Sequence, residues 1–226
     1  MTYFGLLIIN KPAGPTSHDI VDKIRKITGI KKVGHSGTLD PFAEGILIIL
    51  IGKTTKSQSH FMALPKTYTA TIKLGEISDT YDITGQIKSS SFAKAPEGEQ
   101  ILKILKTFIG EIRQTPPVYS AIKINGEKAY KLARKGIKPK MTPRKVKIYK
   151  IKTLNYKWPY LKIEVKCGKG TYIRSLAHDI GKKLGCGAYL ENLIRTKIGK
   201  FDIKKSIKLE NLDYKNWTKK LISDNI

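Results

Sequence analysis

The feature that most constrains the fold is a run of six aliphatic residues, ILIILI, at positions 46–51. A run with no polar position leaves neither face of the segment for water, so both faces must be covered by other parts of the chain. The run is too short to cross a bilayer, which takes about 20 residues in a helix. We therefore expect a fully buried strand, and the segment GLLIIN at 5–10 predicts a second one.

Residues 17–27 have the periodicity of a helix, with Ile20 and Ile24 on one stripe. Ser17 is a residue type that commonly caps a helix N-terminus, and a glycine commonly follows a helix end. We expect Ser17 to cap this helix and Gly29 to end it.

Residues 66–75 alternate between apolar and polar side chains, which predicts a half-buried strand with Tyr68 on its core-facing side. The remaining predicted elements are helices at 99–110, 127–136 and 170–185, strands at 145–151 and 160–167, and a weak helix within 208–226. Strands and helices mix without a regular strand–helix–strand rhythm. This pattern favours an α+β fold with a mixed, mostly antiparallel sheet and flanking helices.

The composition is strongly basic, with 43 Lys and Arg against 18 Asp and Glu and a formal net charge of +25. Such an excess repels itself in the folded state, and its usual reason is a polyanionic partner. Binding to a nucleic acid should then weaken steeply with salt. A lysine-rich solvated surface is the alternative, and an anionic membrane surface comes third.

Metal-binding and export signals are not found. Cys167 and Cys186 are too few for a cysteine-rich zinc site, so we expect reduced, buried thiols. Asp79 and Asp82 resemble part of a calcium loop that lacks its bidentate glutamate. The N-terminus lacks the basic start and the length of a signal peptide, which predicts a cytoplasmic protein. Four histidines show no metal-ligand spacing: His18, His35, His60 and His178.

Asp40 is the candidate catalytic group. It lies among Gly34, Gly37 and Gly45 and directly before Pro41. Glycines let the backbone approach a ligand closely, and a proline biases the residue before it towards an extended conformation. The loop should be stiff, which suits a catalytic carboxylate. The alternative is an ordinary Asp-Pro turn.

A buried carboxylate needs a counter-charge, and Arg174 stands at the start of an otherwise apolar helix. It points either inward to pair with an acid such as Asp40 or outward to water. Tyr68 and Tyr172 are aromatic residues that could stack on an unstacked base, although core packing explains a single tyrosine equally well. His35, five residues before Asp40, suits a loop hydrogen bond as well as catalysis.

Five blocks cover almost everything from residue 5 to residue 201. The blocks are NKPAGPTSHDIVDKIRK (10–26), GHSGTLDPFAEGILIILIGKTTK (34–56), KTYTATIKLGEISDTYDITG (66–85), PPVYSAIKINGEKAYKLARKG (116–136) and CGKGTYIRSLAHDIGKKLGCGAYLENLIRTKIGKF (167–201). Together, and in this order, they resemble the bacterial TruB-type tRNA pseudouridine synthases.

The resemblance implies a pseudouridine synthase core with a central RNA-binding cleft. It implies isomerisation of the uridine conventionally numbered 55 in the tRNA T loop. Asp40 matches the catalytic carboxylate, Tyr68 the tyrosine that stacks on the target base, and Arg174 the arginine that pairs with the catalytic acid. No net redox change or group transfer occurs, so neither a metal nor an organic cofactor is expected.

The resemblance also implies substrate-binding residues. His35 matches the histidine that helps to hold the extruded nucleotide, and Tyr172 and Leu193 match pocket residues. Lys11 falls in the first family motif, which braces the catalytic loop. Where relatives have two adjacent basic residues, the stretch NLIRT keeps only Arg195.

We expect a catalytic domain at 1–205 and a short tail at 206–226 in place of the relatives' usual C-terminal RNA-binding domain of the PUA type. The expected partner is the T arm of tRNA, bound by a monomer with no obligate protein partner and no membrane. Two alternatives stay open: a non-catalytic RNA-binding or tRNA-folding module, and an archaeal-type relative that depends on a guide RNA.

Overall fold

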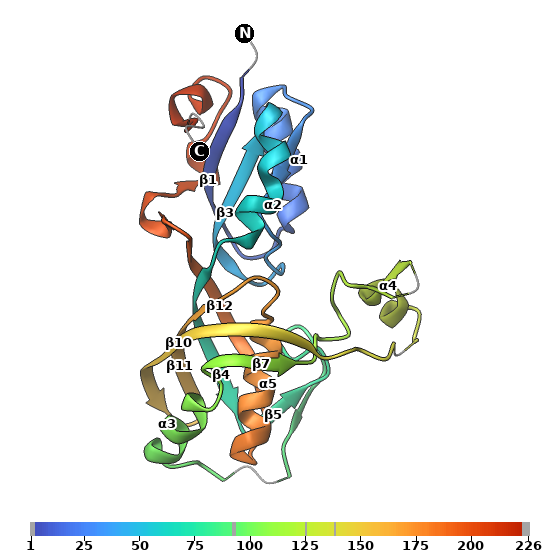
Figure 1. The fold of residues 1–226 in the computed structure, drawn as a ribbon, viewed down its shortest axis with the longest axis vertical. Helices are drawn as coiled ribbons and strands as arrows, with labels where there is room; N and C mark the ends of the chain where they lie inside the picture. Colours follow the sequence, from blue (N-terminus) through green and yellow to red (C-terminus); the bar gives the residue numbers. More distant parts are fainter. Residues whose placement is uncertain (1–2, 92–93, 125, 138, 223–226) are drawn as a thin grey trace. The chain divides into compact units, whose positions relative to one another are not determined.

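The computed structural model describes residues 3–91, 94–124, 126–137 and 139–222 (Figure 1). The chain divides into two compact units. The first contains Met1–Tyr68 and Leu193–Ile226, and the second contains Thr69–Asn192. The boundaries fall inside two strands, β4 (Lys66–Leu74) and β12 (Ala188–Ile198). Strands and helices occur in both units, which confirms the predicted α+β class.

The first unit is built on a mixed set of strands. β1 (Gly5–Lys11) pairs antiparallel with β3 (Glu44–Ile51), and both predicted buried strands are therefore confirmed. β3 also pairs parallel with the end of β12. The short strands that complete this part are β2 (Val33–His35), antiparallel to β3, β13 (Phe201–Asp202), antiparallel to β12, and β14 (Ile207–Lys208), parallel to β1.

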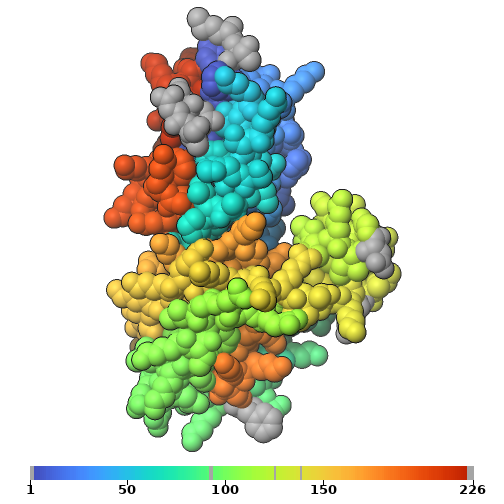
Figure 2. All heavy atoms as spheres, viewed as in Figure 1, coloured from blue at the N-terminus to red at the C-terminus, as the bar shows by residue number. Residues whose placement is uncertain are grey.

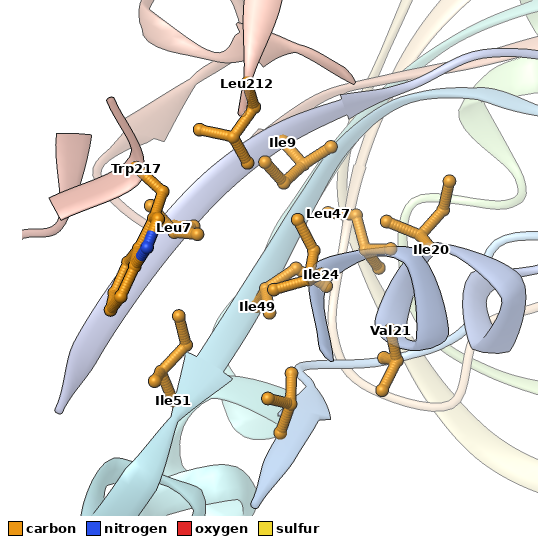
Figure 3. Close-up of a cluster of buried hydrophobic side chains, with 11 residues drawn as sticks. Leu7, Ile9, Ile20, Val21, Ile24, Leu47, Ile49, Ile51, Leu212 and Trp217 are labelled. Carbon is orange, nitrogen blue, oxygen red and sulfur yellow. The ribbon is translucent and has the colours of Figure 1, made fainter. Parts of the chain in front are cut away.

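Both faces of the β1–β3 pair are covered by apolar side chains, as the unbroken aliphatic run requires. On one face, Ile20 and Ile24 of α1 (Ser17–Thr28) pack with Leu212 and Trp217 (Figure 3). On the other face, Phe61 of α2 (Gln58–Ala63) joins Ile198. The strand residues of these two clusters are Leu7, Ile9, Leu47, Ile49 and Ile51 on the first face and Leu6, Ile8, Ile46, Ile48 and Leu50 on the second.

The N-cap of α1 differs from the prediction by one residue. Thr16 caps the helix, and Thr16 and Asp19 form a reciprocal capping box. Ser17 is instead the first helical residue and is buried. Gly29 ends the helix in the left-handed conformation, with φ at 71°, as predicted.

The C-terminal segment was predicted to be a weak helix, and this prediction is wrong. After the single turn η2 (Ile203–Lys205) it forms β14 and then the single turns η3 (Leu209–Asn211) and η4 (Trp217–Lys220). The amide of Leu6 donates to the carbonyl of Ile222, and the amide of Ile222 donates to the carbonyl of Leu6. Pairing with β1 and burial of Trp217 replace the helix, because they bury the apolar side chains against a core that is already formed.

The second unit contains a run of neighbouring strands in the order β4, β11 (Tyr160–Cys167), β10 (Arg144–Lys157) and β7 (Gly110–Gln114). β10 is antiparallel to both of its neighbours. In β4, Tyr68, Ala70, Ile72 and Leu74 are buried and alternate with half-buried residues, which confirms the predicted face.

The helices of the second unit are α3 (Gly98–Lys106), α4 (Ala129–Arg134) and α5 (Ile173–Leu184). α3 ends earlier than predicted, because Gly110 already begins β7 with φ at 107°. Two hairpins complete the unit, β5 (Glu76–Ser78) with β6 (Ile87–Ser89) and β8 (Lys123–Ile124) with β9 (Glu127–Lys128). The segment that carries α4 stands out from the rest of this unit (Figure 2).

Two further expectations concern the whole chain. Cys167 and Cys186 are both buried, as predicted. Over the part of the chain that the structure describes, every helix is too short or too polar to span a bilayer.

Candidate active site

Asp40 lies in the loop that connects β2 to β3. The carbonyl of Asp40 accepts a hydrogen bond from the amide of Ala43 at 3.1 Å, so the loop turns tightly just before the buried strand begins. Asp40 itself is half-buried, and its neighbour Leu39 is buried. The side chain is therefore mounted at the end of the rigid β1–β3 pair, as the glycines and the proline around it predict.

Lys11 holds the loop from the end of β1. Its side chain is fully buried, and Nζ donates to the carbonyl oxygens of Ala43 at 2.7 Å, Pro41 at 3.1 Å and Pro12 at 2.8 Å. These three bonds use all three donors of an ammonium group. Burial lowers the pKa of Lys11 to about 8, and the nearby charge of Asp40 opposes this shift. A buried cation thus fixes the carbonyls on the C-terminal side of Asp40.

Arg195 holds the other side of the loop from β12. It is 1% exposed, and its guanidinium donates to the carbonyl oxygens of Ile46 at 2.8 Å, Gly37 at 3.2 Å and Thr38 at 3.3 Å. The backbones of β12 and β3 meet closely here, because a Cβ on Gly45 would lie 2.3 Å from the carbonyl oxygen of Arg195. Gly45 therefore must be a glycine for Arg195 to reach the loop.

Two uncharged contacts complete the support of the loop. The Ser17 hydroxyl accepts from the amide of Leu39 at 2.9 Å and donates to its carbonyl at 3.1 Å. Nδ1 of His35 accepts from the amide of Gly37 at 3.2 Å. Burial, followed by the positive charge of Arg195, lowers the pKa of His35, so this imidazole is neutral at pH 7.

In the second unit, Arg174 forms a buried ion pair with Asp82. Nη1 lies 3.2 Å from Oδ2 of Asp82, and both side chains are at least 94% buried. Nη2 donates to the carbonyl of Tyr119 at 2.9 Å. The inward orientation of Arg174 that the sequence left open is thus the one observed. Asp82 belongs to the turn that resembled a partial calcium loop, and its carboxylate binds a guanidinium there.

The Asp82 turn is itself strongly constrained. Oδ1 of Asp82 accepts from the hydroxyls of Thr80 and Thr84 and from the amide of Thr84 at 2.9 Å. Tyr81 adopts a positive φ of 65°, which is unfavourable for a bulky side chain. Its ring stacks on His178 of α5 with centroids 4.0 Å apart. The stack and the hydrogen bonds together keep the carboxylate turned towards Arg174.

The start of α5 is fixed by β7. The side-chain amide of Gln114 donates to the carbonyl of Tyr172 at 3.0 Å, and its oxygen accepts from the amide of Tyr172 at 2.8 Å. The Ser175 hydroxyl donates to the carbonyl of Thr115 at 2.7 Å. Arg174 therefore projects from a helix end that is held at the residues on either side of it.

Comparisons with known proteins identify the family. The family described as TruB family pseudouridylate synthase, N-terminal domain, matches residues 25–173, and the tRNA pseudouridylate synthase B C-terminal domain matches residues 174–225. The chain belongs to the TruB family. It is 50% identical over 219 residues to a tRNA pseudouridine synthase B of Clostridium acetobutylicum, covering 97% of this chain and 75% of that protein. A second one, from Prochlorococcus marinus, is 50% identical over 94% of this chain and 68% of that protein.

A solved structure agrees with the TruB assignment. The structure titled as a Cbf5–Nop10–Gar1 complex contains a chain that matches 97% of this one at 32% identity, with a TM-score of 0.75. The match covers 57% of that chain, so this TruB family member spans just over half of its length. The predicted pseudouridine synthase fold is thereby confirmed.

The predicted site residues of this TruB family member divide between the two units. Asp40, His35 and Lys11 come together in the first unit. Tyr68 and Leu193 are also in the first unit and are 9% and 5% exposed. Arg174 and Tyr172 are adjacent in the second unit, so the pairing of Arg174 with Asp40 stays a prediction.

The sequence did not predict the supporting contacts of two residues, Asp82 in the second unit and Arg195 in the first. The pattern around Asp82 predicts a turn that resembles part of a calcium loop, although the threonines on both sides of it indicate an aspartate whose oxygens accept local hydrogen bonds. For Arg195, the sequence indicates only a single basic residue where relatives have two. No local signal reveals its role, because its three partners lie about 150 positions earlier in the chain.

Proposed function

We propose that this protein is a tRNA pseudouridine synthase that isomerises uridine 55 of the T loop. Membership of the TruB family and 50% identity to proteins named tRNA pseudouridine synthase B support the reaction class. The observation that carries the proposal is the loop around Asp40. Lys11 and Arg195, two buried cations, hold the carbonyl groups on both sides of this one carboxylate.

The reaction moves one glycosidic bond. The bond between N1 of uracil and C1′ breaks, the base turns, a bond between C5 and C1′ forms, and the proton on C5 is lost while N1 gains one. The nucleotide must leave its stack first, which costs a few kcal/mol that an aromatic partner lowers. Tyr68 is the proposed stacking partner, because it lies on the buried face of β4 at its N-terminal end.

Asp40 is the proposed catalytic carboxylate. Attack on C1′, attack on the base and removal of the 2′ proton all require it to be ionised. A stiff mount matters because a displacement of about 1 Å can cost on the order of 100-fold in rate. The bonds of Lys11, Arg195 and Ser17 to the loop supply this mount.

Arg174 is proposed to pair with Asp40 in the complex with RNA. Asp82 would then act as a positioning residue, since its carboxylate already binds Nη1 of Arg174 at 3.2 Å. A guanidinium has five donors, so it can bind one carboxylate and still offer N–H groups to another. His35, Tyr172 and Leu193 are proposed to contact the extruded nucleotide.

The remaining assignments are proposals of the same kind. The protein acts on the T arm as a cytoplasmic monomer without an obligate protein partner, and residues 1–205 carry the catalytic groups. The rival readings are a non-catalytic RNA-binding module and a guide-RNA-dependent enzyme.

The test is incubation of the purified protein with unmodified tRNA transcript, followed by chemical mapping of pseudouridine. We expect modification of the T-loop uridine without added guide RNA. Failure to modify the transcript would favour the non-catalytic RNA-binding module. Modification that requires an added guide RNA would favour the guide-RNA-dependent enzyme. Modification of a uridine in another loop would refute the assigned position.

A further inference from the structure

A hollow of about 560 Å³ lies in the first unit, at the end of the β1–β3 pair that is far from Asp40. Tyr3 and Ile30 form its apolar part. The other side chains that line it are lysines, and no acidic residue is among the lining residues. We call this site the lysine hollow, and its four lysines are Lys31, Lys32, Lys53 and Lys56.

The register of the two strands places the lysine hollow relative to the Asp40 loop. Lys11 pairs with Gly45 at the Asp40 end, and Gly5 pairs with Ile51 at the other end. β3 has 8 residues, which corresponds to about 26 Å at the rise of a strand. The lysine hollow follows directly after Ile51, so it is a surface separate from the site around Asp40.

The electrostatics of the lysine hollow favour an anion. All four lysines are exposed. Lys53 lies with Nζ 3.5 Å from the centre of the Phe4 ring, a contact that neutralises no charge. Like charges that converge on one hollow repel one another, and a polyanion removes this cost while releasing its counterions.

The backbone around the lysine hollow is fixed. The amide of Gly52 donates to the carbonyl of Lys32 at 2.8 Å, and Nε of Arg25 donates to the carbonyl of Lys31 at 3.2 Å. Gly52 has a φ of 61°, and a Cβ on it would lie 2.5 Å from the carbonyl oxygen of Tyr3. The lysines are therefore presented on a rigid frame, which limits the ordering cost of binding to their side chains.

Tyr3 adds an aromatic surface to the lysine hollow. The centroid of its ring lies 5.0 Å from the centroid of the Trp217 ring in an edge-on arrangement, and 41% of Tyr3 remains exposed. A held and partly exposed ring between lysines suits nucleic acid, because an unpaired base can stack on it while the lysines bind phosphates.

We infer that the lysine hollow binds the sugar–phosphate backbone of the substrate tRNA beyond the T arm. This inference rests on the proposed function. A separation of about 26 Å corresponds to roughly eight base-pair steps of a duplex. The acceptor stem stacks on the T stem in a folded tRNA and so continues the same helix. A surface at that distance from Asp40 is placed to meet phosphates that an isolated T-arm hairpin lacks.

The experiment compares full-length tRNA with an isolated T-arm hairpin. One variant replaces Lys31, Lys32, Lys53 and Lys56 with Gln. A matched control removes the same charge from exposed lysines of the second unit, Lys106, Lys150, Lys162 and Lys166. Kd, KM and kcat are measured for both RNAs between 50 and 300 mM salt, and melting temperatures confirm that each variant is folded.

We expect the lysine hollow variant to bind full tRNA about tenfold or more weakly, with a salt slope smaller by roughly two to four. Its kcat on either RNA and its KM for the hairpin should stay within about twofold of wild type. An unchanged KM for full tRNA would overturn the inference, and so would an equal loss in the control variant. Continued modification of the hairpin would show that the proposed function stands even if the inference fails.

Discussion

The ammonium nitrogen of Lys11 lies 2.7 Å from the carbonyl oxygen of Ala43, although 32 positions separate the two residues in the chain. This bond ties the end of β1 to the loop that carries Asp40. Because Lys11 also binds Pro41 and Pro12, its removal takes a donor from three carbonyl groups at once, and the carbonyl of the buried residue Ala43 is one of them.

Lys11→Met should therefore release the loop. We expect kcat to fall about 100-fold with a smaller change in KM, because the loss of position affects the reacting group more than RNA binding. Single-turnover kinetics on a tRNA transcript measure this effect. Lys26→Met is the control, since Lys26 is an exposed lysine of α1 and should behave as wild type. A Lys11→Met enzyme with wild-type kcat would show that the loop does not need this brace.

The rate should also depend on pH through Lys11. Burial lowers its pKa to about 8, so its positive charge is lost as the pH rises through 8. We expect kcat to decline between pH 8 and pH 9.5. Above pH 8 the unfolded chain binds this proton more tightly than the folded protein, so the contribution of Lys11 to stability rises with pH while the rate falls. Rates and melting temperatures measured in the same buffers separate the effect on kcat from the effect on stability. If kcat of the Lys11→Met variant still declined around pH 8, the titration would belong to another group.

Asp82→Asn should leave the buried guanidinium of Arg174 without the negative charge that pairs with it. Breaking a buried ion pair by removing one partner costs about 3–5 kcal/mol, and the rate should fall at least about 100-fold because Arg174 loses its orientation. Denaturant unfolding and single-turnover rates measure the two losses. Asp79→Asn is the matched control, because Asp79 is exposed and an asparagine can still accept the bond from the amide of Gln86. Equal unfolding free energies and equal single-turnover rates for the two variants would contradict the role assigned to Asp82.

The backbone of Tyr81 gives a prediction in the same turn. Its φ of 65° favours glycine, whereas its ring stacks on His178. Tyr81→Ala loses the stack and keeps the unfavourable conformation, and Tyr81→Gly loses the stack but relieves the strain. We expect Tyr81→Gly to be the more stable of the two by about 1 kcal/mol in urea unfolding. The opposite order would show that the positive φ carries no cost.

The C-terminal segment should contribute to the stability of the first unit. Trp217 is buried against β1 and contacts Tyr3, so Trp217→Ala should lower the free energy of unfolding by about 3–5 kcal/mol. Tyr214 is 72% exposed, and Tyr214→Ala should change the free energy of unfolding by less than about 0.5 kcal/mol. Equal unfolding midpoints for the two variants would show that the segment is an appendage.

The sequence predicted elements whose signals are local. The apolar runs of β1 and β3, the alternation of β4 and the glycine after α1 each report on their own segment, and each was correct. The prediction of a helix in the C-terminal segment was wrong. The apolar residues of this segment pack on strands that lie some 200 positions earlier in the chain, and that tertiary contact outweighs a weak helical pattern.

The site shows the same division. Asp40 was predictable because the glycines and the proline that shape its loop are its neighbours in the chain. The sequence could not predict the partners of Arg195 or the pairing of Arg174 with Asp82, because the residues involved are between 92 and 158 positions apart. A cation that binds backbone carbonyl groups needs no acidic partner. The sequence therefore contains no opposite charge that would indicate where such a cation binds.

The most direct test of the central claim is the activity of Asp40→Asn on unmodified tRNA transcript, with binding measured on the same preparation. Asparagine keeps the size of the side chain and removes the charge that each possible first step requires. We predict no detectable pseudouridine at the T-loop uridine and a Kd for tRNA within about threefold of wild type. Formation of pseudouridine at that position at a rate close to wild type would contradict the account.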